Sequence, residues 1–279
     1  MLAVTGGVPR YLEEIDPAQT AEQNIERLCF RSGGPLFNEF GQIFHDIFSR
    51  RAETYREIVA TLVDGPRSIT EISKGLRRRR GGTLSEAMED LESAGFLSRD
   101  VAFNPITAKN RPRTLRYRIC DNYLRFYLKY IEPVTEQVRK GLYRRTPLEA
   151  FQAWDSIVGL QFENLVLGNL ALIVERIGLS NVPVLNAGPY FQARTARRPG
   201  CQIDLLLRTK HSLYVFEVKF RARIDNSVIA EVRKKIDCLD GVAGLSIRRG
   251  LIYQEEVAPE VTQADYFDHL VPFERLLVP

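Results

Sequence analysis

The sequence lacks the features that would place the protein in a membrane or outside the cell. No run of about 18 apolar residues occurs, so a transmembrane helix is not expected. The first residues, Met1–Asp16, have neither the basic start nor the apolar stretch of a signal peptide. Four cysteines are scattered without a CxxC pair, at Cys29, Cys120, Cys201 and Cys238. A zinc site or disulfide framework is therefore not expected, and the thiols are predicted to be reduced in a cytoplasmic protein.

The sequence also contains no phosphate-binding loop of the form Gly-x-x-x-x-Gly-Lys-Ser/Thr. Such a loop cradles the phosphates of a nucleotide with its backbone N–H groups, and its lysine reaches the terminal phosphates. We therefore expect this chain to bind no nucleotide by itself and to hydrolyse no ATP by itself.

Charge is distributed unevenly along the 279 residues, although the net charge is only +4. Residues 50–130 carry 17 Lys and Arg against 10 Asp and Glu, a balance of +7, whereas residues 1–49 carry 3 against 7. A basic segment attracts nucleic acid because phosphate binding releases condensed counterions. A solvated face rich in arginine would give the same composition, so charge alone leaves both interpretations open.

The chain is long for one hydrophobic core and sufficient for two or three small domains. Its patterning predicts a multi-domain α+β protein. The predicted segments are a helical lid-like segment (1–49), a winged helix-turn-helix domain (50–120), a helical linker (121–146) and a mixed α/β sheet domain (147–279). In the last domain, helical stretches flank short apolar runs of strand length. The predicted helices are about Leu148–Ile177 and Val228–Leu239, and the predicted strands are Val182–Leu185, Ile203–Leu207, Leu213–Val218 and Leu251–Tyr253.

Residues 50–120 show three helical periodicities followed by a hairpin. The first helix is predicted at about Thr54–Leu62 and the third at about Leu84–Ala94. Ser68 is expected to cap the second helix, with Glu71 three residues later completing a capping box. The second hairpin strand is predicted at Leu115–Ile119. This order of elements is typical of a winged helix, whose third helix enters the major groove while the wing contacts phosphate.

Basic residues occupy the turn and the wing of this predicted domain, where a docked duplex would present its backbone. They are Arg77, Arg78, Arg79, Arg80, Lys109, Arg111, Arg113, Arg116 and Arg118. The exposed face of the third helix is acidic, through residues such as Glu86 and Glu89, which disfavours base reading. We expect non-specific DNA binding led by the turn and the wing. A winged helix that contacts another protein is the alternative.

The most specific chemical pattern is Asp204 in one apolar run, followed by Glu217 and Lys219 in the next. A hairpin folded at Arg208–Ser212 would place the two carboxylates side by side, and Glu217 and Lys219 face the same side of one strand. Two carboxylates can bind Mg²⁺ or Mn²⁺, together with the Val218 carbonyl. The cation would activate water for phosphodiester hydrolysis, with Lys219 orienting the water. The alternative interpretation is a charged edge of a sheet.

Glu163, on the preceding predicted helix, is the candidate that would complete the acidic cluster. A solvated helix residue is an equally good interpretation of Glu163 alone. The catalytic candidates are therefore Asp204, Glu217, Lys219 and Glu163, and the metal-ligand candidates are Asp204 and Glu217.

Three groups of motifs follow one another along nearly the whole chain. The first comprises Gly6–Leu12 (GGVPRYL), Asn24-Ile25 and Gly33–Glu39 (GGPLFNE). The second is the aromatic stretch Tyr117–Tyr127 (YRICDNYLRFY), and the third comprises Phe162-Glu163, Ile203-Asp204 and Glu217–Lys219. Together they resemble the C-terminal portion of archaeal-type AAA/STAND-like ATPases. The resemblance implies a lid remnant, a winged helix and a last domain of the PD-(D/E)XK nuclease superfamily.

Members of that family begin with a P-loop domain, which this sequence does not contain. The resemblance therefore implies an ATPase core that is supplied by an upstream segment or a separate protein, or that has been lost. The leading hypothesis is a DNA-binding protein whose last domain is a Mg²⁺- or Mn²⁺-dependent nuclease, or a descendant of one. The alternatives are a non-catalytic DNA-binding or regulatory module, and an interaction subunit that joins a P-loop ATPase through residues 1–49 or self-associates.

Overall fold

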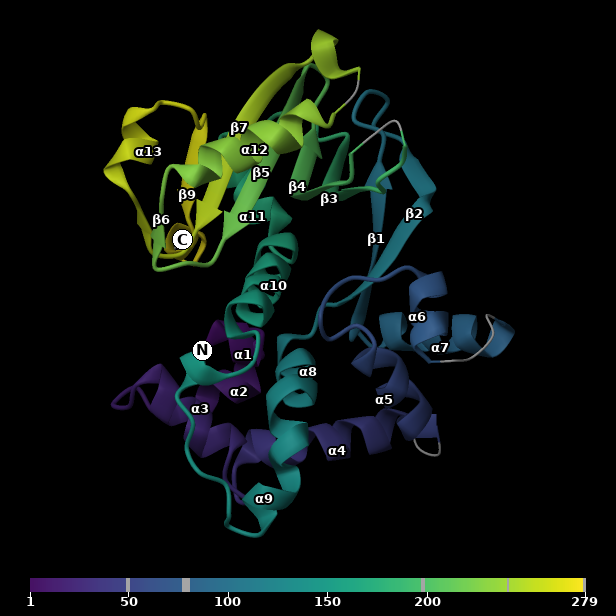
Figure 1. The fold of residues 1–279 in the computed structure, drawn as a ribbon, viewed down its shortest axis with the longest axis vertical. Coiled ribbons are helices and arrows are strands. Elements are labelled where there is room, and N and C mark those ends of the chain that lie inside the picture. The colour runs from purple at the N-terminus through teal and green to yellow at the C-terminus, as the bar shows by residue number, and fades with distance from the viewer. Residues whose placement is uncertain (49–50, 77–80, 197–198, 240, 278–279) are drawn as a thin grey trace. The chain divides into compact units, whose positions relative to one another are not determined.

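The computed structural model describes residues 1–48, 51–76, 81–196, 199–239 and 241–277. The chain divides into two compact units (Figure 1). Unit 1 comprises residues 1–99 and 116–164, and unit 2 comprises residues 100–115 and 165–279. Unit 1 is mainly helical, whereas unit 2 is built on a five-stranded sheet. The protein thus has the multi-domain α+β fold that its sequence predicts.

The N-terminal part of unit 1 consists of α1 (Leu2–Thr5), α2 (Pro9–Glu13), α3 (Ala21–Cys29) and α4 (Pro35–Phe48). Helix α3 begins at a capping box. Thr20 Oγ1 accepts a hydrogen bond from Gln23 N at 3.2 Å, and Gln23 Oε1 accepts one from Thr20 N at 2.8 Å. The turn before α4 requires glycine at Gly34, because a Cβ atom there would overlap Leu28 O. Residues 1–48 are therefore helical with loop interruptions, as predicted.

An aromatic segment lies against these N-terminal helices. It comprises α8 (Asn122–Phe126), the π-helical turn η2 (Tyr127–Ile131), the 3-10 turn η3 (Glu132–Val134) and α9 (Thr135–Arg139). The Tyr123 hydroxyl donates a hydrogen bond to Leu36 O at 2.6 Å and accepts one from Phe40 N at 3.0 Å. It therefore inserts into the backbone hydrogen-bond ladder of α4. Phe40 also stacks on Tyr127, with ring centroids 4.1 Å apart, so the two segments share one core.

Three helices and a two-stranded hairpin occupy residues 51–119. They are α5 (Ala52–Ala60), α6 (Ile69–Gly75), α7 (Gly82–Ser93), β1 (Leu97–Phe103) and β2 (Asn110–Ile119). Helix α6 begins at the predicted capping box, in which Ser68 Oγ accepts a hydrogen bond from Glu71 N at 3.3 Å. The predicted apolar faces are buried, through residues that include Tyr55, Ile58, Val59, Ile72, Leu84, Met88 and Leu91. The order of elements predicted from periodicity is confirmed.

Unit 2 is organised around a mixed sheet with the strand order β3-β4-β5-β7-β9. The strands are β3 (Asn186–Gln192), β4 (Cys201–Arg208), β5 (Ser212–Lys219), β7 (Ser246–Tyr253) and β9 (His269–Pro272). Strands β3, β4 and β5 pair antiparallel, whereas β5, β7 and β9 pair parallel. Helix α12 (Ser227–Asp237) joins the parallel strands β5 and β7 and lies across one face of the sheet (Figure 1). The smaller elements are β6 (Arg223–Ile224), η5 (Val242–Gly244), β8 (Glu256–Val257), α13 (Pro259–Gln263) and η6 (Phe273–Leu276).

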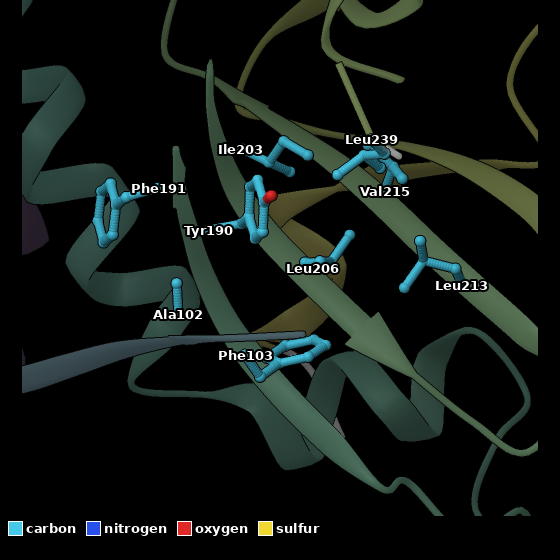
Figure 2. Packing of buried hydrophobic residues seen from close by; sticks show 9 residues of the cluster. All are labelled: Ala102, Phe103, Tyr190, Phe191, Ile203, Leu206, Leu213, Val215 and Leu239. Carbon is cyan, nitrogen blue, oxygen red and sulfur yellow. The ribbon is translucent and has the colours of Figure 1, made fainter. Parts of the chain in front are cut away.

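The tip of the hairpin belongs to the core of unit 2. Ala102 and Phe103 of β1 are fully buried in one apolar cluster with residues of β3, β4 and β5 (Figure 2). The other members of the cluster are Tyr190, Phe191, Ile203, Leu206, Leu213, Val215 and Leu239. Arg208 donates a hydrogen bond to Pro105 O at 2.9 Å, and Asn186 donates one to Ala108 O at 2.8 Å. The sheet therefore holds the tip of the predicted wing.

Two helices occur where the sequence predicts one long helical stretch. Helices α10 (Trp154–Leu167) and α11 (Leu170–Arg176) are bent by 73° at the break between them, and the short turn η4 (Leu148–Ala150) precedes them. Across the described ranges, no single helix has the length and apolar composition needed to cross a membrane. Helices α10 and α11 meet those two criteria only when they are taken together.

The first strand of the sheet begins later than predicted. The segment Val182–Leu185 is irregular, and both Val182 and Leu185 are exposed. Strand β3 begins instead at Asn186, which pairs with Arg208 of β4. The prediction from the local apolar pattern was wrong here, because the position of a strand depends on its partner strand more than on intrinsic propensity. Strand β9, only four residues long, was not predicted for the same reason.

Candidate functional site

The pairing of β4 with β5 places Asp204 beside Glu217. The two strands pair from Arg208↔Leu213 outward to Leu205↔Phe216, so Asp204 and Glu217 are the next residues on each strand. Asp204 Oδ2 accepts a hydrogen bond from Val218 N at 2.9 Å, which ties the carboxylate to the neighbouring strand. Both carboxylates are buried, with 7% of Asp204 and 2% of Glu217 exposed. Such burial of two like charges is costly unless positive charge compensates them.

Lys235 of α12 supplies part of that compensation. Its ammonium lies 2.5 Å from Glu217 Oε2 and 3.6 Å from Asp204 Oδ1. The two carboxylates therefore share one cationic group. Helix α12 can deliver this side chain because it packs on β4 and β5, the two strands that carry the carboxylates.

Lys219 supplies the second positive charge. Its ammonium lies 2.9 Å from Glu217 Oε1 and 2.6 Å from Glu231 Oε2, the latter also on α12. Glu217 consequently contacts one ammonium group with each carboxylate oxygen. The structure thus brings together Asp204, Glu217 and Lys219, three of the four residues that the sequence predicts as catalytic.

The ionisation of the cluster follows from burial and from its neighbours. Burial, followed by the nearby charge of Glu217, raises the pKa of Asp204 to about 6. Burial by itself would lower the pKa of Lys235, but Asp204 and Glu217 hold that pKa above its ordinary value. The ion pair with Lys219 lowers the pKa of Glu231. Near neutral pH both ammonium groups are therefore charged, and the raised pKa of Asp204 brings its ionisation toward that range.

The donor set fits a hard divalent cation in part. Asp204 and Glu217 offer carboxylate oxygens, and Mg²⁺ is often held by only one or two carboxylates, with waters and substrate phosphates filling its octahedron. Within the described ranges, no group of three or more His, Cys, Asp or Glu side chains is arranged to hold a metal ion. The ammonium of Lys235 now lies between the two carboxylates, where a cation held by both of them would lie.

Glu163, the fourth predicted catalytic residue, lies on α10 in unit 1 and is half-buried. Its negative charge acts on Arg125 of the same unit and raises the pKa of that guanidinium, against the larger lowering effect of burial. Asp204, Glu217 and Lys219 belong to unit 2. A role of Glu163 in their site remains a prediction.

The predicted DNA-binding residues occupy different environments. Arg77, Arg78, Arg79 and Arg80 lie outside the described residues, and so does the side chain of Arg113. Lys109 is exposed and Arg111 is half-buried. Arg116 is half-buried and donates a hydrogen bond to Pro66 O at 3.2 Å. Glu86 and Glu89 of α7 are exposed, so the acidic face predicted for the third helix is present.

The sequence predicted Arg118 on the DNA-contacting surface of the wing, and this prediction was wrong. It is 6% exposed and donates hydrogen bonds to Asn164 Oδ1 and, at 3.4 Å, to Ser98 Oγ. Its polar partners on α10 and β1 satisfy the guanidinium in this buried position. The guanidinium is therefore engaged inside unit 1 and is not placed to contact a phosphate.

Sequence reasoning missed Glu231 and Lys235. Both lie on α12 and are four residues apart, so they project from the same side of the helix. The signal that could have identified them is this Glu-x-x-x-Lys pair on the helix that directly follows the Glu217–Lys219 strand. Their meeting with the carboxylates depends on how α12 packs on the sheet, which the spacing alone does not give.

No family model matches the chain. The uncharacterized protein MJECL04 of Methanocaldococcus jannaschii is 25% identical over 247 residues, covering 78% of this chain and 53% of that protein. The chain therefore spans about half the length of the curated relative that it matches.

Two solved structures are similar to parts of the chain. A repair endonuclease from Pyrococcus abyssi has a TM-score of 0.25 at 14% identity, covering 38% of this chain and 45% of that one. Protein VC1899 from Vibrio cholerae has a TM-score of 0.34 at 13% identity, covering 88% of this chain and 55% of that one. Scores this low do not establish a common fold, so the function is inferred from the side chains of this chain. The resemblance to AAA/STAND-like ATPases stays a prediction.

Proposed function

We propose that unit 2 is a divalent-cation-dependent nuclease that hydrolyses phosphodiester bonds in DNA. The observation that supports the proposal is the cluster in which Asp204 and Glu217, from paired strands, share one ammonium group while Lys219 contacts Glu217 from the same strand. Buried like charges with perturbed ionisation are retained at functional sites more often than at structural ones. Here the pKa of Asp204 is raised to about 6 by burial and by Glu217.

In the proposed reaction, Asp204, Glu217 and the Val218 carbonyl would hold Mg²⁺ or Mn²⁺. The cation would polarise the phosphate and lower the pKa of a bound water. Glu217 and Glu231 hold the ammonium of Lys219, so this side chain has a fixed position from which to orient the attacking water. The carboxylates and Lys219 thus provide positioning and charge, the two contributions on which phosphoryl-transfer catalysis mainly depends.

DNA is the proposed substrate because positive charge is concentrated in residues 50–130, with a balance of +7. Binding through phosphate contacts is independent of base sequence. The acidic exposed residues of α7, including Glu86 and Glu89, would be repelled by the phosphates that flank a major groove. We therefore propose non-specific duplex binding led by the four consecutive arginines at residues 77–80.

A plasmid-nicking assay tests the proposal. Supercoiled plasmid is incubated with the full chain in Mg²⁺, in Mn²⁺ or in EDTA, and open-circular product is quantified. Nicking is expected only with a divalent cation, and Asp204→Asn should reduce it by about 10²-fold or more, because removing a charge-stabilising group typically costs that much. Asp237→Asn is the matched control, since Asp237 is exposed on α12. Nicking that survives in Asp204→Asn would contradict the proposal.

A non-catalytic DNA-binding module is the second candidate, and one observation favours it. Lys235 already lies between the two carboxylates, so Asp204 and Glu217 have a positive counter-charge without metal. The same assay separates the candidates when it is run beside a gel-shift measurement. Salt-sensitive plasmid binding with no nicking in either metal supports the non-catalytic module.

A further inference from the structure

We propose that Lys235 is a built-in competitor of the divalent cation, and that its ammonium must leave the Asp204–Glu217 pair before the metal can bind. The inference rests on the proposed function, because it concerns the same two carboxylates. It extends that function by assigning control of metal occupancy to Lys235 of α12, which lies outside the Asp and Glu-x-Lys motifs.

The first argument is positional. Each of the four carboxylate oxygens already has a protein partner: Glu217 contacts Lys219 and Lys235, and Asp204 contacts Lys235 and the Val218 N–H. Lys235 Nζ is the group that contacts both carboxylates. A divalent cation held by both carboxylates would take the place that this ammonium occupies, so the ion and the ammonium would exclude each other.

The second argument is the charge of the cluster. Fully ionised, it contains three carboxylates and two ammonium groups, a net charge of −1. Such a cluster repels a phosphodiester. Binding of Mg²⁺ reverses the net charge to +1 if the displaced ammonium stays nearby, and a positive site attracts phosphate. Metal entry therefore prepares the site for substrate as well as for chemistry.

The third argument is that Lys235 can move. Its side chain is 23% exposed, so the ammonium has a route to water, whereas the Glu217 side chain is 3% exposed. Lysine carries its charge on a flexible four-carbon stem, which allows the ammonium to retreat without any change in the helix. The fixed carboxylates and the mobile ammonium together form an exchangeable counter-ion site.

The expected consequence is a weakened apparent metal affinity in the wild type. A ligand that needs a minor state binds with its intrinsic affinity reduced by the population of that state. If Lys235 occupies the site about nine-tenths of the time, its removal tightens metal binding about tenfold. Removal also leaves two carboxylates without their shared cation, so the metal-free protein should lose thermal stability.

The test compares Lys235→Gln with Lys234→Gln, an exposed neighbour on the same helix. Metal-free full-length proteins are titrated with Mn²⁺ without DNA, and the dissociation constant is measured by calorimetry. We expect Lys235→Gln to bind about tenfold more tightly than the wild type, and Lys234→Gln to bind like the wild type. Thermal denaturation should show a lower metal-free Tm for Lys235→Gln and a larger increase with Mn²⁺.

The outcomes separate this inference from the proposed function. If Mn²⁺ binding needs Asp204 but Lys235→Gln binds no more tightly than the wild type, the competitor role is overturned and the metal site stands. If neither protein binds Mn²⁺, the inference and the metal-dependent function fail together. If Lys235→Gln is unfolded without metal, recovery of its circular dichroism spectrum on Mn²⁺ titration supports the inference, and no recovery overturns it.

Discussion

At Asp204 a carboxyl group is buried beside a second carboxyl group, and its pKa is raised to about 6 by burial and then by Glu217. An unfolded aspartate titrates near 3.9. Between about pH 4 and 6 the folded state retains a proton that the unfolded state has lost, so stability falls as the pH rises through that window. Above about pH 6, where Asp204 is ionised in the folded state, the free energy of unfolding is reduced by the full amount.

Asp204→Asn should therefore stabilise the protein at pH 8 while removing the proposed nuclease activity. Without divalent cations we expect the free energy of unfolding to rise by about 1–3 kcal/mol, because each pKa unit corresponds to 1.36 kcal/mol. The amide oxygen can still accept the hydrogen bond from Val218 N. The gain should vanish near pH 4, where the wild-type carboxyl group is protonated.

Urea denaturation in EDTA at pH 8 and at pH 4 measures this difference. Asp237→Asn, on the exposed side of α12, should change stability at neither pH. A loss of stability at pH 8 would show that Lys235 compensates the charge of Asp204 more fully than the raised pKa of Asp204 indicates. An equal gain at both pH values would show that the gain does not come from the ionisation of Asp204.

Among the elements, the turn between α3 and α4 offers two adjacent glycines in different surroundings. A Cβ atom at Gly34 would overlap the backbone oxygen of Leu28, whereas a Cβ atom at Gly33 meets nothing within 4 Å. We expect Gly34→Ala to reduce the free energy of unfolding by about 1–3 kcal/mol, the usual cost of forcing atoms into packed space. Gly33→Ala should stay within about 0.5 kcal/mol.

Thermal and chemical denaturation of the two glycine variants gives a matched comparison, since they differ by one position. Equal effects would mean that the turn adjusts its backbone freely. The comparison also tests the glycine-rich motif at residues 33–39, which the sequence identified by resemblance and the structure explains by a close backbone approach at Gly34.

The hairpin β1–β2 is the element whose interpretation changed most. As a wing it was expected to offer a row of basic side chains to DNA. Its tip instead packs in the core of unit 2 through Ala102 and Phe103, and Arg118 is buried in unit 1. Arg77–Arg80, which lie outside the described residues, are therefore the stronger candidates for phosphate contacts.

Replacing Arg77, Arg78, Arg79 and Arg80 together with alanine should weaken duplex binding and flatten its salt dependence. Each phosphate contact adds about −0.9 to the slope of log K against log salt, so the slope should become shallower by up to about 3–4. Fluorescence anisotropy between 50 and 200 mM salt measures both effects. The control is Arg139→Ala with Lys140→Ala, an exposed pair beside Glu136. Wild-type affinity that is independent of salt would rule out phosphate-led binding.

For the whole molecule, the purified chain should not bind ATP. We expect this because the 279 residues contain no phosphate-binding loop that could cradle the nucleotide phosphates. Titration with a fluorescent ATP analogue in Mg²⁺ should give no saturable signal up to about 1 mM, the weak end of ordinary ligand affinities. Tight binding by this chain alone would contradict the expectation. Co-purification with a P-loop ATPase would instead support a partner that acts through residues 1–49.

The sequence by itself determined the elements whose causes are local. Periodicity located α5, α6 and α7, the Ser68–Glu71 pair fixed the start of α6, and the apolar runs located β4 and β5. It also predicted the central carboxylate pair of the candidate site, because residues at similar distances from the turn at residues 208–212 become neighbours across a hairpin. Asp204 and Glu217 follow from that count, and Lys219 follows from strand alternation.

Only the tertiary structure decided what depends on partners distant in sequence. Strand β3 begins where β4 can pair with it, and the hairpin tip is held by Arg208 and Asn186 of the sheet. Lys235 enters the site because α12 packs on β4 and β5. Local sequence encodes periodicity and turns, but burial and ion pairing depend on which surfaces meet, so the position of Lys235 between the two carboxylates becomes apparent only in the folded chain.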